Sequence, residues 1–262
     1  MDPTQEPKYV KLRKFNMIMG ALHLVQFFLM LILVTGSTFD VYGTFLRTDP
    51  STSPPTITRE TDNVLFSLPL GLMVALFLLA SAIAHFSVAS KWGYPWYVKN
   101  LEKGVNYARW FEYGVSSSIM IVVIAMLCGI FELSSLILIF ALNAMMNMMG
   151  LMMEVHNQTT PKTDWTAFII GCFAGIVPWI VIGIYFFAAI LSSTGTIPPF
   201  VYAIYFILAI FFNVFALNMV WQYRRKGKWA DYLYGEKVYI ILSLTAKTAL
   251  AWLVFGGTNW PS

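Results

Sequence analysis

Long apolar runs separated by short polar segments are the dominant pattern along this chain. Seven runs are long enough to cross a membrane as a helix, which needs roughly 20 apolar residues. The predicted spans are 15–36, 64–90, 105–130, 133–155, 165–192, 198–222 and 235–256. The first run is too long for a cleavable signal peptide, and no small-residue cleavage site follows it. The pattern therefore predicts an all-α membrane protein, a seven-transmembrane-helix bundle that forms a single domain over residues 1–262.

One connection between the spans, residues 37–63, is long, whereas the others are short. Inside it, the segments 41–47 and 56–59 flank the turn-rich stretch Asp49–Pro55. Two β-prone segments on either side of such a stretch are typical of a hairpin. We expect a short extracellular β-hairpin between the first and second helices.

Composition narrows the class of protein further. Hydrophobic residues make up 58% of the chain and charged residues 11%, against about 25% charged residues in soluble domains. So much apolar surface excludes a water-soluble enzyme, a disordered chain and a nucleic-acid-binding domain. The two cysteines, Cys128 and Cys172, lie inside apolar runs and are not spaced like metal ligands. We expect no enzymatic activity, no metal and no nucleic-acid partner.

The basic residues are distributed on one side of the predicted topology. Of the 17 lysines and arginines, most fall in the N-terminal segment and in the second, fourth and sixth connections. The opposite side holds only Arg47 and Arg59. Because basic loops stay in the cytoplasm, we predict a multi-pass protein of the cell membrane with a cytoplasmic N-terminus and an extracellular C-terminus.

Two basic residues, Arg109 and Lys247, remain inside the apolar runs. Lys247 lies about twelve residues into the last span, or roughly 18 Å deep at 1.5 Å per residue. A charged lysine near the bilayer centre costs about 2.5 kcal/mol or more. It is either a structural lysine paired inside the bundle or a lysine that forms a covalent Schiff base, because burial favours the neutral, nucleophilic amine.

Glu112 is the acidic residue that the pattern puts well inside a helix, about seven residues into the third span. The other acidic residues, Glu154 and Glu236 included, fall in tails, loops or the ends of spans. A carboxyl group in hydrocarbon is neutral or paired. We therefore expect Glu112 to face Lys247 and to balance the charge of a protonated Schiff base.

Several segments carry a resemblance to a known family. They are Phe111–Ser118, Gly175–Trp179, Gly227–Trp229 and Leu242–Trp252, together with His23. With a mid-span lysine in the last of seven helices, the chain resembles the microbial rhodopsins. Over essentially its whole length it is most similar to the heliorhodopsins, whose hallmark is the inward N-terminus.

The resemblance implies a chromophore and the residues that hold it. Lys247 would carry all-trans retinal, Glu112 would be the counterion, and Ser243 would form a hydrogen bond near the Schiff base. The resemblance and the helical spacing also supply candidates for the surrounding pocket. These are Trp110, Tyr113, Ser117, Asn143, Met146, Gly150, Trp179 and Phe212. The family also suggests a homodimer, with the hairpin near the contact.

A second polar group lies near the depth of Glu112. His23, Ser81 and His85 fall roughly 8–12 Å from the predicted cytoplasmic edge, and histidine suits transient proton storage. We hypothesise an inner cavity of these residues and Glu112 that accepts the Schiff-base proton and returns it. In the alternative, each histidine only satisfies a helix–helix hydrogen bond. Arg109 either caps this cavity or extends its side chain to the membrane surface, and we favour the second.

The same positions bear on ion transport. Proton-pumping relatives carry a carboxylate one turn before the lysine, where this chain has Ser243. The outer half offers no deep carboxylate or histidine, so we expect it to be dry. We therefore predict a retinal photoreceptor that senses light, transfers a proton internally without net pumping, and signals to an unknown cytoplasmic partner. The alternative is a light-driven or light-gated proton transporter. Besides retinal, the predicted partners are membrane lipid and a second copy of the chain.

Overall fold

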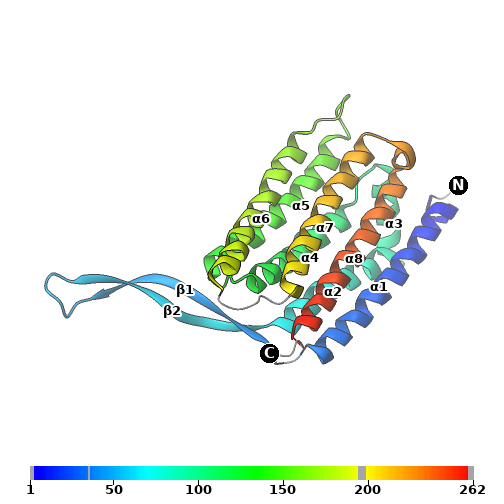
Figure 1. The fold of residues 1–262 in the computed structure, drawn as a ribbon. Helices are drawn as coiled ribbons and strands as arrows, with labels where there is room; N and C mark the ends of the chain where they lie inside the picture. The colour runs from blue at the N-terminus through cyan, green and yellow to red at the C-terminus, as the bar shows by residue number, and fades with distance from the viewer. Residues whose placement is uncertain (1–2, 35, 194–198, 259–262) are drawn as a thin grey trace.

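The computed structural model describes residues 3–34, 36–193 and 199–258. Within these residues, seven helices are long and apolar enough to cross a membrane, and they pack side by side as a bundle (Figure 1). The spanning helices are α1 (Pro7–Leu33), α2 (Leu70–Ala89), α4 (Tyr107–Leu127), α5 (Leu133–His156), α6 (Thr166–Ser192), α7 (Pro199–Tyr223) and α8 (Tyr232–Thr258). The predicted seven-helix membrane fold is confirmed.

The first helix begins earlier than the hydrophobic pattern predicted. α1 starts at Pro7, directly after Glu6, rather than at residue 15. Proline is favoured at the first helical position because its missing N–H is not needed there. The added turns carry Lys8, Lys11 and Arg13. The boundary was wrong because hydropathy marks the apolar part of a helix and not its polar extension.

A short helix, α3 (Gly93–Glu102), lies in a connection that we expected to be a loop. Its buried residues Tyr94, Tyr97, Val98 and Leu101 recur at the spacing of one helical face. Burial of these four side chains against the end of the bundle stabilises a helix that is too short to form alone in water. Two single-turn 3-10 helices, η1 (Pro3–Gln5) and η2 (Gly227–Ala230), complete the described helical elements.

The predicted hairpin is confirmed and is longer than expected. β1 (Thr38–Asp49) pairs antiparallel with β2 (Thr56–Pro69), from Thr38 opposite Pro69 to Asp49 opposite Thr56. It projects from one end of the bundle (Figure 1). The second span therefore starts at Leu70 and not at residue 64. That boundary was wrong because a short apolar run such as 64–68 fits a strand as well as a helix.

The two ends of the bundle differ in character. The start of α1, the short helix α3 and the α7–α8 connection lie at the end opposite the hairpin (Figure 1). The largest apolar core cluster includes Ile121 and Ile124 in the last turns of α4, Phe186 of α6 and Leu250 of α8. These turns lead toward the hairpin, because the backbone N–H of Tyr42 in β1 donates to the carbonyl of Phe131 just after α4 (2.9 Å). The hairpin half of the bundle is therefore packed with apolar side chains.

Candidate functional site

A buried ion pair joins two helices near the middle of the bundle. Lys247 lies midway along α8 and is 2% exposed, and its Nζ is 2.9 Å from Oε1 of Glu112 on α4. The expected juxtaposition of these two residues is present in the structure. A buried ion pair is stable only when further hydrogen bonds satisfy both groups, so the surroundings of the pair matter.

Two serines supply these hydrogen bonds. The Nζ of Lys247 donates to Oγ of Ser243 (2.7 Å), which lies four residues earlier on the same face of α8. Ser81 of α2 donates its hydroxyl to Oε1 of Glu112 (2.6 Å). The pair is thus connected to three helices, and Ser243 contacts the lysine nitrogen.

A cavity of about 430 Å³ adjoins the lysine. Its volume falls in the usual range for small-molecule pockets, roughly 300–1,000 Å³. Nine of the residues singled out from the sequence line it: Trp110, Tyr113, Ser117, Met146, Gly150, Trp179, Phe212, Ser243 and Lys247. Residues that the sequence analysis did not single out also line it, among them Phe168, Phe215, Met219 and Tyr239. The walls are predominantly apolar, with the lysine amine as their cationic group.

Glycines give this cavity part of its space. A Cβ atom on Gly150 of α5 would lie 2.3 Å from the ring of Trp110, and one on Gly175 of α6 would lie 2.4 Å from Sδ of Met146. Real Cβ atoms do not approach so closely. Larger residues at either position would therefore push Trp110 or Met146 away from its present place.

Aromatic side chains pack edge to face around the cavity. The ring of Trp179 lies 5.3 Å from that of Phe212, and the ring of Trp110 lies 6.4 Å from that of Tyr113. The Nζ of Lys247 stands 5.2 Å above the ring of Tyr113, and the hydroxyl of Tyr113 donates to the carbonyl of Tyr239 (2.9 Å). Such edge-to-face pairs hold rings in fixed orientations.

Asn143 is the predicted pocket residue that does not line the cavity. It is buried on α5 and donates to Oγ of Ser117 (2.7 Å), which does line it. Asn147, which also lines the cavity, donates to the same hydroxyl (3.0 Å). Asn143 therefore acts on the cavity wall through Ser117.

The two histidines lie together on α1 and α2. Their rings stack with centroids 5.6 Å apart, and Nδ1 of His85 is 2.7 Å from Oδ1 of Asn16. His23 is fully buried, and neither of its ring nitrogens has a hydrogen-bond partner among the described residues. His85 and Glu112 line a second cavity of about 40 Å³. His23 and Ser81 are not among the described lining residues; His23 stacks on His85, and Ser81 donates a hydrogen bond to Glu112.

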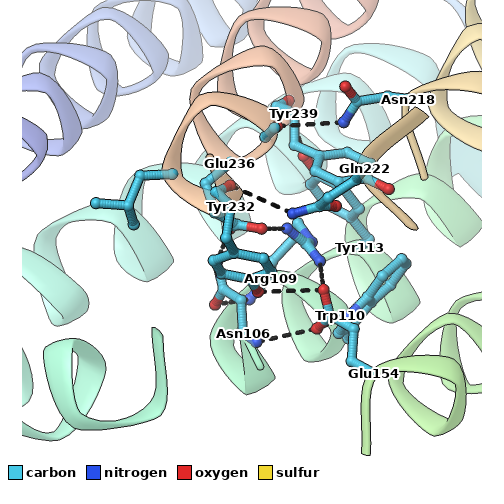
Figure 2. A network of polar contacts seen from close by, with 12 residues as sticks. Asn106, Arg109, Trp110, Tyr113, Glu154, Asn218, Gln222, Tyr232, Glu236 and Tyr239 are labelled. Carbon is cyan, nitrogen blue, oxygen red and sulfur yellow. Dashed lines mark hydrogen bonds and ion pairs between the residues drawn. The ribbon is translucent and has the colours of Figure 1, made fainter. Parts of the chain in front are cut away.

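Arg109 does not extend to the membrane surface, so that expectation was wrong. It is 6% exposed and forms ion pairs with Glu154 of α5 and Glu236 of α8, as Figure 2 shows. It also lines the small cavity beside His85 and Glu112. Two carboxylates pair with its guanidinium, and these interactions outweigh the hydration that a side chain in the first turn of α4 could gain at the membrane surface.

Glu154 and Glu236 are the site residues that the sequence analysis missed. They are 2% and 0% exposed, although both lie near the ends of predicted spans. Position along a span therefore gave the wrong depth for them. Arg109 was the available signal, because a guanidinium in an apolar run needs an anion.

One comparison with known proteins identifies a family for this chain. The model of a protein family described as heliorhodopsin matches residues 12–259 of the chain. A search of curated proteins found no match. The family match covers α1 from residue 12 onward, the other six spanning helices completely, and all residues that line the two cavities.

Proposed function

Because the chain belongs to the heliorhodopsin family, a family of light-absorbing proteins that bind retinal, we propose that it is a light sensor whose chromophore is attached to Lys247. All-trans retinal is the isomer proposed. The observation that carries the proposal is the amine of Lys247, held 2.9 Å from a single carboxylate at the wall of a 430 Å³ apolar cavity.

The residues of the cavity fit an elongated apolar aldehyde. Its walls are aromatic and sulfur side chains, and the glycines at 150 and 175 leave space that any side chain would fill. An aldehyde reacts with a neutral amine, and Lys247 is the lysine that lines the cavity. When bound, retinal supplies the absorption of visible light and a light-driven change of shape.

Glu112 and the serines have defined tasks in this proposal. Glu112 balances the positive charge at Nζ of Lys247. Ser243 accepts a hydrogen bond from that nitrogen, and Ser81 fixes the carboxylate by donating to its Oε1. Trp179 and Phe212 pack against each other and limit the positions that the far part of a ligand can take.

The inner polar residues hold a proton during the light response. Glu112 receives it from the nitrogen at Lys247, and the small cavity brings His85 within reach of Glu112. His23, stacked on His85, has two buried ring nitrogens that offer a further position. The proton then returns by the same way, because the described residues that pack the hairpin half of the bundle form a large apolar cluster.

Substitution of the lysine tests the attachment. Lys247→Ala is expected to give a protein without visible absorption after addition of retinal, because no other lysine among the described residues lines the cavity. Lys162→Ala, which removes an exposed lysine in the α5–α6 connection, is the matched control and should remain coloured. Visible absorption by Lys247→Ala equal to that of the control would contradict the attachment site.

The alternative function is a light-driven or light-gated proton transporter. The polar residues that extend from Lys247 through Ser243 to His85 favour it. Such a series of polar residues would form one half of a proton path across the membrane. Illuminated vesicles that contain the protein distinguish the two functions. The proposal predicts no sustained change of external pH, whereas a lasting change that a protonophore abolishes would establish transport.

The arrangement in the cell is part of the same proposal. The end of the bundle with the start of α1, α3 and the α7–α8 connection carries most of the basic residues, which supports a cytoplasmic placement. The hairpin would then be extracellular, in the cell membrane. An unidentified cytoplasmic partner would read the light-driven change at the basic end.

A second copy of the chain is the proposed occupant of the hairpin surface. Leu46 and Ile57 of the hairpin are 72% and 66% exposed, and such apolar surface outside a membrane marks a contact. Leu46→Glu with Ile57→Glu is expected to convert a homodimer in detergent into monomers. Ser51→Glu, at the hairpin turn, should leave the dimer intact, and a dimer in both variants would exclude the hairpin as the contact.

A further inference from the structure

The second group of buried charges, around Arg109, has no task in the proposed light response. Arg109 of α4 lies between Glu154 of α5 and Glu236 of α8 and pairs with both (Figure 2). Asn106 also bridges them, since its backbone N–H donates to Oε2 of Glu154 (3.0 Å) and its Nδ2 donates to Oε2 of Glu236 (2.6 Å). We call these four residues the Arg109 cluster.

The charges of this cluster do not balance. It contains two carboxyl groups, and within the described part of the chain Arg109 is the cation that pairs with them. With both carboxyls ionised, the cluster would bury one net negative charge. An uncompensated buried charge is far more costly than a neutral carboxylic acid, so such a group takes up a proton.

The hydrogen bonds indicate which carboxyl group is ionised. Glu154 accepts four: from Arg109, from the backbone of Asn106, from Nε1 of Trp110 (2.6 Å) and from the hydroxyl of Tyr232 (3.2 Å). Glu236 accepts two, from Arg109 and Asn106. Donated hydrogen bonds stabilise a carboxylate, so Glu154 is the better anion and Glu236 the better holder of a proton.

The other titratable groups near the cluster are tyrosines. They are Tyr97 of α3, Tyr113 of α4, Tyr223 of α7, and Tyr232 and Tyr239 of α8. The ring of Tyr239 lies against the guanidinium, 4.0 Å from its carbon atom. These side chains are neutral at ordinary pH. They therefore donate hydrogen bonds and exclude water without supplying the missing positive charge.

The small cavity connects this cluster with the first ion pair. Arg109 and Asn106 of the cluster line it together with His85 and Glu112. Its volume of about 40 Å³ admits a few water molecules, because one water needs roughly 10–15 Å³ of such space. The Nε of Arg109 is buried without a hydrogen-bond partner among the described residues, so it can bind such a water.

We propose that the Arg109 cluster is a second buried proton site, in which Glu236 holds one exchangeable proton beside ionised Glu154. Its members Arg109 and Asn106 line the cavity that Glu112 also lines, and through these two residues the cluster can exchange protons with the polar residues there by way of water. This site exists in the dark and does not depend on a chromophore.

Infrared spectroscopy of the dark protein tests the site. A buried protonated glutamic acid gives a carbonyl stretching band that ionised carboxylates lack, and label at the glutamate carboxyl carbons identifies it. One such band is expected, and it should shift in heavy water because the proton exchanges. Absence of the band, or a band that heavy water leaves unshifted, would overturn the proposal.

Single substitutions provide the sharper test. Glu236→Gln removes the holder of the proton, so the band should be lost. Glu154→Gln should also abolish the band, because Glu236 then becomes the sole partner of Arg109 and ionises. If one carboxyl group held the proton independently of the other, the band would persist in one of the two variants. That result would contradict the proposal. Glu132→Gln, which changes a partly exposed carboxylate that caps α5, should keep the band.

Two measurements guard against misfolding and against confusion with the proposed function. Glu236→Asp and Glu154→Asp keep both carboxyls and should move the band rather than remove it. A protein that shows the band but never acquires colour with retinal would refute the attachment to Lys247 and leave the proton site standing. A coloured protein without the band would refute the proton site and leave the attachment to Lys247 standing.

Discussion

Among the side chains described, Lys247 combines three properties that matter for function. It is 2% exposed, it touches a carboxylate, and it lines the large cavity. Position along the sequence predicted its depth, and the need for charge balance predicted Glu112 as its partner. Nothing in the sequence pattern alone predicted the hydrogen bond from Ser81 to Glu112, because that contact depends on how α2 lies against α4.

Neutralisation of the carboxylate at position 112 should weaken the hold on the proton at Lys247. In Glu112→Gln, the positive charge on the nitrogen of the retinal-bound protein loses its partner. The pH at which the visible band disappears should therefore fall by about 1–3 units, the usual effect of a nearby opposite charge. A spectrophotometric titration measures it.

Glu132→Gln is the matched control for this titration. The hydrogen bond from Ser134 holds the pKa of Glu132 below its usual range, so this distant carboxylate stays ionised throughout the measurement. Its replacement should leave the midpoint unchanged. An equal midpoint in Glu112→Gln and in the unchanged protein would exclude Glu112 as the counterion.

The glycine at position 150 should be sensitive to a single methyl group. Gly150→Ala would place a Cβ 2.3 Å from Trp110 and displace a ring that lines the cavity and donates to Glu154 (2.6 Å). Overpacking of this kind costs about 1–3 kcal/mol. We expect a shifted absorption maximum and faster thermal bleaching. Gly256→Ala, where nothing lies within 4 Å, should change neither, and equal spectra for both variants would show that the cavity is not the pocket.

At the scale of elements, hydropathy predicted the seven helices but not their polar extensions. α1 begins at Pro7 because its first turns leave the apolar stretch, where an average over apolar residues gives no signal. α3 was missed although Tyr94, Tyr97 and Leu101 have helical spacing, since a 10-residue amphipathic helix is weaker than a spanning run. β2 was predicted too short because strand and helix look alike over so few residues.

Helix packing explains why the Arg109 cluster could not be predicted from the sequence. Glu154 and Glu236 lie near the ends of α5 and α8, and each alone is consistent with a solvated residue. Their burial arises because α4, α5 and α8 converge on Arg109. An arginine inside an apolar run predicts that some anion is present, but not which helices provide it.

Loss of the central cation should therefore destabilise the bundle strongly. Arg109→Gln leaves buried carboxyl groups without their partner, and removal of one partner from a buried pair costs about 3–5 kcal/mol. The temperature at which the retinal-bound protein loses its colour in detergent should fall steeply. Arg47→Gln breaks the exposed pair with Glu60 (3.3 Å) and should cost about 0–1 kcal/mol. Similar losses in both variants would show that the Arg109 cluster contributes no special stability.

The whole molecule is polarised along the bundle. The hairpin half is an apolar core cluster, whereas the opposite half contains Arg109, Glu154 and Glu236 and the small cavity. On our proposal, a proton that leaves the nitrogen at Lys247 finds titratable acceptors, among the described residues, on the side of the small cavity. This asymmetry favours internal proton transfer over transport across the membrane.

The orientation of this asymmetry can be measured in intact cells. A maleimide that cannot cross membranes should label Ser51→Cys at the hairpin turn, because that turn is expected outside. It should not label Lys162→Cys in the α5–α6 connection until the cells are opened. The native cysteines lie within or beside spans, with Cys128 buried and Cys172 on α6, so background labelling should be low. The reverse pattern would place the basic end outside.

The attachment of the chromophore is the central claim, and its location can be read directly. Retinal-bound protein is reduced with borohydride, which fixes an amine-linked retinal as a stable secondary amine, and the peptides are then mapped by mass spectrometry. We predict one retinyl group, on the peptide that contains Lys247. A retinyl group on any other lysine, or coloured protein that yields no modified peptide, would contradict it.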